Sequence, residues 1–161
     1  MDRRVVFPRI LIVCGLVLVG TAGCATMQGG MVSQDPVADR QRLMRLNGAS
    51  WADIQAKVKA GNIDGVAVNA ETIAINAMHI PALFPEGSLT PKSNAKPEIW
   101  QKWDDFTKAA KNFETLAANL RDRSRAKDKA GVEAAVKEFG AKACGTCHTP
   151  FRVPPPPPPK K

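Results

Sequence analysis

The sequence predicts an all-α protein, folded as an antiparallel, up-down-up-down four-helix bundle. Apolar residues recur at intervals of three and four along four segments, the period of helices with one apolar stripe each. The remaining sequence has no convincing strand pattern. The segments are joined by short connections, apart from one loop rich in Pro, Gly and Ser. Helices joined in this way pack antiparallel around a shared core.

The first helix is expected from Pro36 to about Ala60. Asp35 is a suitable N-cap, Pro36 suits the first helical position, and Gly61 suits the C-terminal cap. The second helix is predicted from a stripe with 3-4-3-4-3 spacing, made of Ile63, Val66, Ala70, Ile73, Ala77 and Ile80.

The third helix is expected to start at Pro97 and the fourth to reach Cys147. The third has the stronger stripe: Ile99, Trp103, Phe106, Ala110, Phe113, Ala117 and Leu120. The fourth has Val132, Val136, Phe139 and Ala143, and its stripe continues to Cys147. Residues 81–97 between the second and third helices predict a surface crossing loop.

The N-terminus has the pattern of a signal peptide. Three arginines precede an apolar run at 10–19, which is too short to span a bilayer comfortably. Residues 21–24, Thr-Ala-Gly-Cys, resemble a bacterial lipobox with Thr21 in place of the usual leucine. We therefore predict that the chain is exported to the bacterial periplasm and anchored there as a lipoprotein through Cys24. Ordinary cleavage that leaves a soluble product is the alternative.

These signals divide the chain into four parts. Residues 1–23 are the predicted signal peptide, 24–34 a flexible tether, 35–153 a single helical domain, and 154–161 a proline-rich tail. The six prolines of the tail favour polyproline II, either as a stiff solvated tail or as a docking peptide. Cleavage removes three of 23 basic and one of 15 acidic residues, which leaves 20 and 14 and a net charge of +6. An exported basic protein favours acidic partners or anionic membranes over nucleic acid.

The sequence Cys144-Gly-Thr-Cys147-His148 is typical of c-type haem attachment. Each cysteine would bond one haem vinyl group, and His148 would bring its imidazole under the iron. On a helix these positions are i, i+3 and i+4, so their side chains share one face. A zinc site needs a fourth ligand, and a thioredoxin-like dithiol needs a βαβ context that is missing here. A chance match to this short motif is the remaining alternative.

Four segments carry a resemblance to a known family. RQRLMRLNGASW, IPALFPEGS, AKPEIW and CGTCHTPFR occur in this order between Asp35 and Arg152. In them the chain resembles class II cytochromes c, the cytochrome c′ superfamily, and is most like the low-spin cytochrome c-556 type. The resemblance implies one covalent haem c, with its iron, between the helices near the C-terminal end of the chain. Members of this family often dimerise, so it also allows a homodimer.

The same resemblance implies which residues bind the iron. In low-spin members the sixth ligand is a methionine four residues after an arginine on the first helix. Met44 stands four residues after Arg40, so His148 and Met44 would be the axial ligands. Packing in the core is the alternative for Met44, and Met78 at the end of the second helix is a rival ligand. Arg40 would lie near a haem propionate, where a charge-assisted hydrogen bond is favourable.

Other residues near these ligands are weaker candidates. Arg152 follows His148 by four residues and lies near the proximal histidine in the family, although a solvated surface arginine is equally consistent. His79 faces away from the apolar stripe of its helix, which favours exposure. Met27 and Met31 precede the bundle in a Gly-containing linker, where they are poorly placed to bind iron.

Electron transfer is the function that this site favours. With both axial positions filled, the protein would be a one-electron carrier that serves redox partners in the cell envelope, and it would not be an enzyme. A high-spin protein that binds nitric oxide or carbon monoxide at an open sixth position is the alternative. A structural lipoprotein without haem is disfavoured by the intact Cys-x-x-Cys-His motif.

Overall fold

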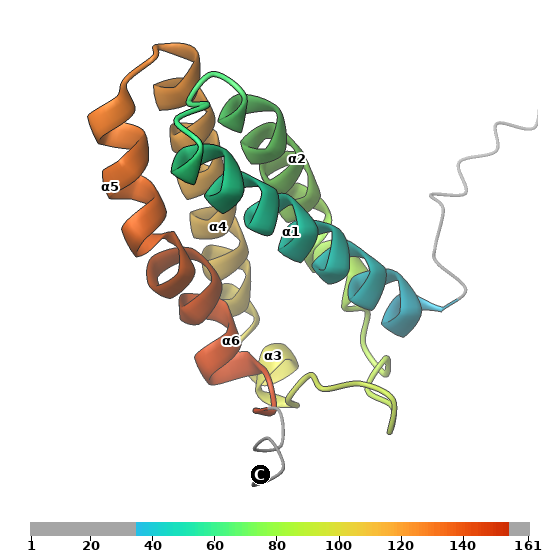
Figure 1. The fold of residues 1–161 in the computed structure, drawn as a ribbon. Helices are drawn as coiled ribbons and strands as arrows, with labels where there is room; N and C mark the ends of the chain where they lie inside the picture. Colours follow the sequence, from blue (N-terminus) through green and yellow to red (C-terminus); the bar gives the residue numbers. More distant parts are fainter. Residues whose placement is uncertain (1–34, 155–161) are drawn as a thin grey trace, which may run out of the picture. The chain divides into compact units, whose positions relative to one another are not determined.

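The computed structural model describes residues 35–154, and most of these residues are helical (Figure 1). The predicted signal peptide, the tether as far as residue 34 and tail residues 155–161 lie outside the described residues. The elements follow one another as α1 (Pro36–Lys59), α2 (Val66–His79), the 3₁₀ turn η1 (Pro81–Leu83), α3 (Glu98–Gln101), α4 (Trp103–Arg125), α5 (Lys129–Phe139), the π-helical turn η2 (Gly140–Gly145) and α6 (Thr146–Phe151).

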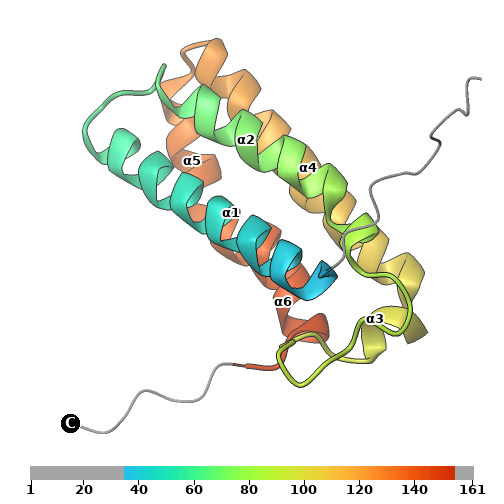
Figure 2. The ribbon, with the colours of Figure 1, turned by 90° about the vertical axis from the view of Figure 1, so that its right-hand side faces the viewer.

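The long helices form the predicted up-down-up-down bundle. Figures 1 and 2 show α1 and α4 running in one direction, and α2 and α5 in the other. Helix α2 packs against α1 and α4, and α4 packs against α5, whereas α1 and α5 touch at few points. The side of the bundle between α1 and the C-terminal helices is therefore the least tightly closed at the backbone level.

The helix ends follow the predicted capping residues. The Asp35 carboxylate accepts a hydrogen bond from the Ala38 amide at 2.9 Å, and Pro36 begins α1. Gly61 follows the end of α1 with φ of +73°, a conformation that favours glycine over residues with a Cβ. Asp128, which was not predicted as a cap, also caps α5 by accepting from the Gly131 amide at 2.9 Å.

The predicted stripes form most of the core. The buried residues among them are Ile63, Val66, Ala70, Ile73, Ala77, Ile80, Ile99, Phe106, Ala110, Phe113, Ala117, Leu120, Val132, Phe139 and Ala143. Val136 is only partly buried and packs on the edge of this core. The apolar period along each segment was therefore a reliable guide to the inward face of each helix.

The expected continuous third helix is interrupted, and the prediction that Trp103 belongs to its inward apolar stripe was wrong. Lys102 has φ of −125° and ψ of +49°, which ends α3 and lets α4 begin at Trp103. The break rotates Trp103 out of the stripe that joins Ile99 to Phe106, so 37% of its surface is exposed. Its ring still packs against Phe106, with the ring centroids 5.5 Å apart.

The crossing loop after α2 is more than the surface connection that its composition predicted. Phe84 and Ser88 are buried within it. At its far end the Lys96 amide donates to the Phe151 carbonyl at 3.0 Å, and the Val153 amide donates to the Asn94 carbonyl at 2.8 Å. The loop is thus bound to the chain segment that ends α6.

None of the helices within residues 35–154 is both long enough and apolar enough to cross a membrane.

Candidate functional site

The Cys-x-x-Cys-His motif lies where η2 meets α6. Cys144 is in the π-helical turn, and Cys147 and His148 are in the first turn of α6. All three side chains are partly buried, and all three line one apolar cavity. The predicted shared face is therefore present, although the π-helical turn replaces the regular helix that was expected before the motif.

The cavity consists of two adjoining chambers. The outer chamber has a volume of about 400 Å³ and the inner one about 140 Å³. Four residues line both chambers and so join them, namely Met44, Ile80, Cys147 and His148. Side chains from α1, α2, α4 and the C-terminal helices therefore converge on one site.

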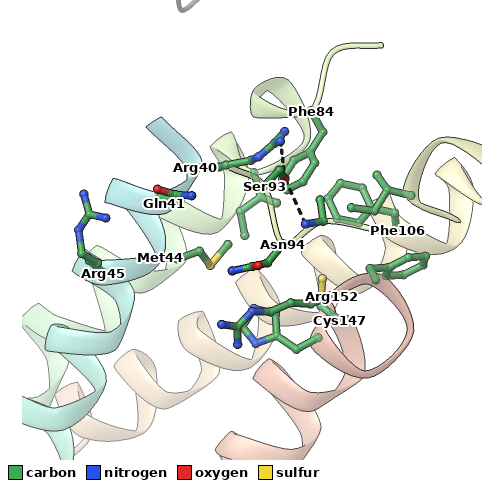
Figure 3. Close-up of a pocket in the computed structure, with 15 residues that line it drawn as sticks. Arg40, Gln41, Met44, Arg45, Phe84, Ser93, Asn94, Phe106, Cys147 and Arg152 are labelled. Carbon is green, nitrogen blue, oxygen red and sulfur yellow. Dashed lines mark hydrogen bonds between the residues drawn. The ribbon is translucent and has the colours of Figure 1, made fainter. Parts of the chain in front are cut away.

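Met44 reaches this site and Met78 does not. Figure 3 shows the Met44 side chain extending from α1 toward the centre of the cavity, with Cys147 on the other side. Met78 is 63% exposed and lines neither chamber. His79 is also exposed, as its position on α2 predicted. The structure thus brings Met44, and not its rival, together with His148.

The outer chamber is lined by positive charge. Arg40, Arg45 and Arg152 are among its lining residues, and no Asp or Glu among the described residues lines it. The inner chamber is mostly apolar, with walls from Trp51, Phe113 and others. A flat apolar group with carboxylates at one edge would match this division, because each half would meet its complementary surface.

Arg40 is buried, with 5% of its surface exposed, and both of its terminal nitrogens donate to the crossing loop. Figure 3 shows its hydrogen bond to Ser93. Nη1 donates to the Leu83 carbonyl at 3.3 Å and to Ser88 Oγ at 3.1 Å. Nη2 donates to the Ser88 carbonyl at 2.7 Å and to Ser93 Oγ at 2.8 Å. The guanidinium also lies 4.6 Å from the centroid of the Phe84 ring.

These contacts assign Arg40 a structural role that the sequence did not indicate. Burial lowers the pKa of its guanidinium, and the nearby Asp35 charge acts in the opposite direction. Gln41 adds a further link, because its Nε2 donates to the Lys92 carbonyl at 2.9 Å. The predicted place of Arg40 beside a haem propionate stays a prediction. The residue lines the outer chamber, but both of its terminal nitrogens donate to the crossing loop.

The pKa shifts of the three motif side chains favour a neutral imidazole and protonated thiols before any cofactor is attached. Burial raises the pKa of the Cys144 thiol, and burial together with the Cys144 charge raises the pKa of Cys147 to about 11. Burial, then the Arg152 charge, lowers the pKa of His148. A neutral imidazole is the form that binds a metal. In the part of the chain that the structure describes, no three His, Cys, Asp or Glu side chains cluster as a zinc site would require.

Several lining residues escaped the sequence reasoning. Ser93 and Asn94 come from the loop, and Asn47 from α1. The loop residues gave no periodic signal, and Asn47 is a polar residue whose burial depends on a neighbouring helix. Gly48 also lines the inner chamber, and a Cβ added there would meet nothing within 4 Å, so this wall has room for a flat ring. The residues present therefore fit haem.

The chain is similar to known cytochromes in sequence and in fold. The sequence profile of the family described as Cytochrome C' matches residues 35–152. The chain is 39% identical over 132 residues to cytochrome c-556 of Agrobacterium fabrum, which covers 78% of this chain and 86% of that protein. Its fold is similar to the crystal structure of cytochrome c′ from Thermochromatium tepidum, with a TM-score of 0.67 and 27% identity over 74% of this chain and 95% of that one.

The chain therefore belongs to the cytochrome c′ family of helical haem proteins. It carries a covalently bound haem c with iron, and one haem is typical of the family. A second similar structure is of a cytochrome c′ described as having ligand-controlled dimer dissociation. Its TM-score is 0.67 and its sequence identity 27%, and the match covers 74% of this chain and 95% of that one. Its solved relatives thus include dimeric forms.

Proposed function

We propose that the protein is a one-electron carrier whose haem iron has His148 and Met44 as axial ligands. The observation that carries the proposal is that these two side chains, from α6 and α1, line the same two chambers together. Cys144 and Cys147, which lie beside them, would hold the haem through two thioether bonds. When bound, the haem iron supplies the one-electron couple.

The residues around the iron would determine its preference for the reduced state. Thioether sulfur is a soft, neutral ligand that favours ferrous iron, and the apolar inner chamber keeps water away. Arg45 and Arg152, which line the outer chamber, would hold the propionates in place, while the terminal nitrogens of Arg40 bind the crossing loop. None of these groups acts on a substrate, and we propose a carrier and not an enzyme.

The optical spectrum of the purified holoprotein tests this proposal. With both axial positions filled, the reduced protein should show sharp low-spin bands and the oxidised protein a weak far-red band from sulfur-to-iron charge transfer. Exposure of the reduced protein to carbon monoxide should leave the spectrum almost unchanged. A high-spin spectrum with ready carbon monoxide uptake would instead support the alternative, a gas-binding protein with an open sixth position.

We also propose that the protein works in the bacterial periplasm, tethered by a lipid on Cys24, and exchanges electrons with partner proteins of the cell envelope. The relatives are bacterial cytochromes. Cys24 lies outside the described residues, so the proposal rests on the sequence around the cleavage site.

Mass spectrometry of the mature N-terminus tests the tether. The expected product lacks residues 1–23 and carries lipid on Cys24. Replacing Cys24 with serine should release the protein from the membrane fraction while leaving the haem spectrum unchanged. An unmodified N-terminus at another residue would instead identify a soluble periplasmic carrier.

A further inference from the structure

Asn47 presents a buried donor that the protein itself does not satisfy. It lies on α1 three residues after Met44, lines the inner chamber, and has 6% of its surface exposed. Its Oδ1 accepts a hydrogen bond from Asn76 Nδ2 on α2 at 2.8 Å. Its own Nδ2 is buried and has no acceptor among the described residues.

An unpaired amide inside a cofactor cavity requires an explanation. Most buried polar groups in proteins have a partner, since an unpaired donor loses its hydrogen bonds to water without replacement. The hydrogen bond from Asn76 holds the Oδ1 end of the Asn47 side chain toward α2, so its Nδ2 end is the one without a partner. Apart from Met44, the lining side chains that could accept a hydrogen bond are Cys144, Cys147 and His148, and these are the residues that the haem would engage.

Met44 supplies an acceptor on the same helix and in the same chamber. Residues three apart on a helix are neighbours on its surface, and both Met44 and Asn47 line the inner chamber. A thioether sulfur has two lone pairs and is a weak acceptor. When one lone pair is bound to iron, the second remains free to accept an N–H.

We propose that Asn47 donates a hydrogen bond to the iron-bound Met44 sulfur, and that Asn76 holds the Asn47 amide in the orientation this requires. The inference rests on the axial ligation proposed above. Donation to the sulfur withdraws electron density from the iron, and the positive end of the N–H dipole faces it. Both effects disfavour the more positive ferric state. Asn47 would thus be a positioning residue that raises the reduction potential.

Replacing Asn47 with leucine in the holoprotein tests the proposal. Leucine has a similar size, cannot donate and suits the apolar chamber. Loss of one hydrogen bond of ordinary strength should raise the ferric-to-ferrous ratio at a fixed ambient potential by about three- to tenfold. The far-red sulfur-to-iron band should persist but move in wavelength. Asn119→Leu, the same substitution at an exposed position of α4, should change neither.

A second variant keeps the test decisive if Asn47→Leu does not fold. Asn76→Ala leaves Asn47 in place but removes the group that orients its amide, and should shift the ratio in the same direction by less. If the far-red band is present and neither variant changes the ratio or the band, the inference is wrong while the electron-carrier proposal stands. If the wild-type protein lacks the band, the ligation by Met44 is wrong, and this inference with it.

Discussion

Replacing Met44 with alanine is expected to turn a low-spin haem into a high-spin one and to let carbon monoxide bind readily. The side chain lines both chambers beside His148, so its removal would open the sixth coordination position. The oxidised protein should lose the far-red sulfur-to-iron band completely. Its reduction potential should also fall, because the soft ligand that favours ferrous iron is gone. Optical spectra of both oxidation states, with and without carbon monoxide, measure these changes.

Met78→Ala is the matched control for this variant. Met78 is exposed and lines neither chamber, so its replacement should leave the spectrum and the carbon monoxide response unchanged. A high-spin product from Met78→Ala would mean that the function survives with another ligand. A wild-type protein that is already high-spin would give the same spectrum as Met44→Ala, and the carrier proposal would then be wrong.

Replacing Arg40 with alanine is expected to lower the free energy of unfolding by about 2–4 kcal/mol. The substitution removes four hydrogen bonds to Leu83, Ser88 and Ser93 and the contact with the Phe84 ring. It also leaves the acceptors of the loop without a donor in a largely buried region. Urea denaturation followed by far-ultraviolet circular dichroism measures the change.

Two further variants separate the contacts of Arg40 from its charge. Arg40→Lys keeps the positive charge but lacks the planar guanidinium that reaches several acceptors at once. It should therefore recover only part of the lost free energy of unfolding. Arg42→Ala removes an exposed arginine whose only described ion pair is with Asp39 at 2.7 Å, and should cost less than about 1 kcal/mol. Equal losses for Arg40→Ala and Arg42→Ala would contradict a structural role for Arg40.

The fold could be predicted from the sequence because its signals are local and periodic. The cap at Asp35 and the turn at Gly61 depend on a few neighbouring residues, and both formed as expected. The apolar stripes placed the inward faces of the helices correctly. The break at Lys102 was missed because no Pro or Gly marks it, and the exposure of Trp103 follows from that break.

The candidate site could be predicted only in its motif and through family resemblance. The Cys-x-x-Cys-His motif is contiguous, and the spacing from Arg40 to Met44 is a family pattern. The loop contacts of Arg40 join residues 43 to 53 positions apart, and no local pattern encodes them. The unpaired amide of Asn47 likewise depends on where α2 places Asn76.

The π-helical turn η2 limits how this chain can change in length. It extends from Gly140 to Gly145 between two α-helical segments, and Cys144 lies within it. Each residue gained or lost in a helix turns everything that follows by about 100°. A single-residue deletion among residues 140–143 would keep the haem-binding motif intact in the sequence but turn it away from Met44. Insertions and deletions are therefore restricted in this short segment by geometry, even where its individual side chains are free to vary.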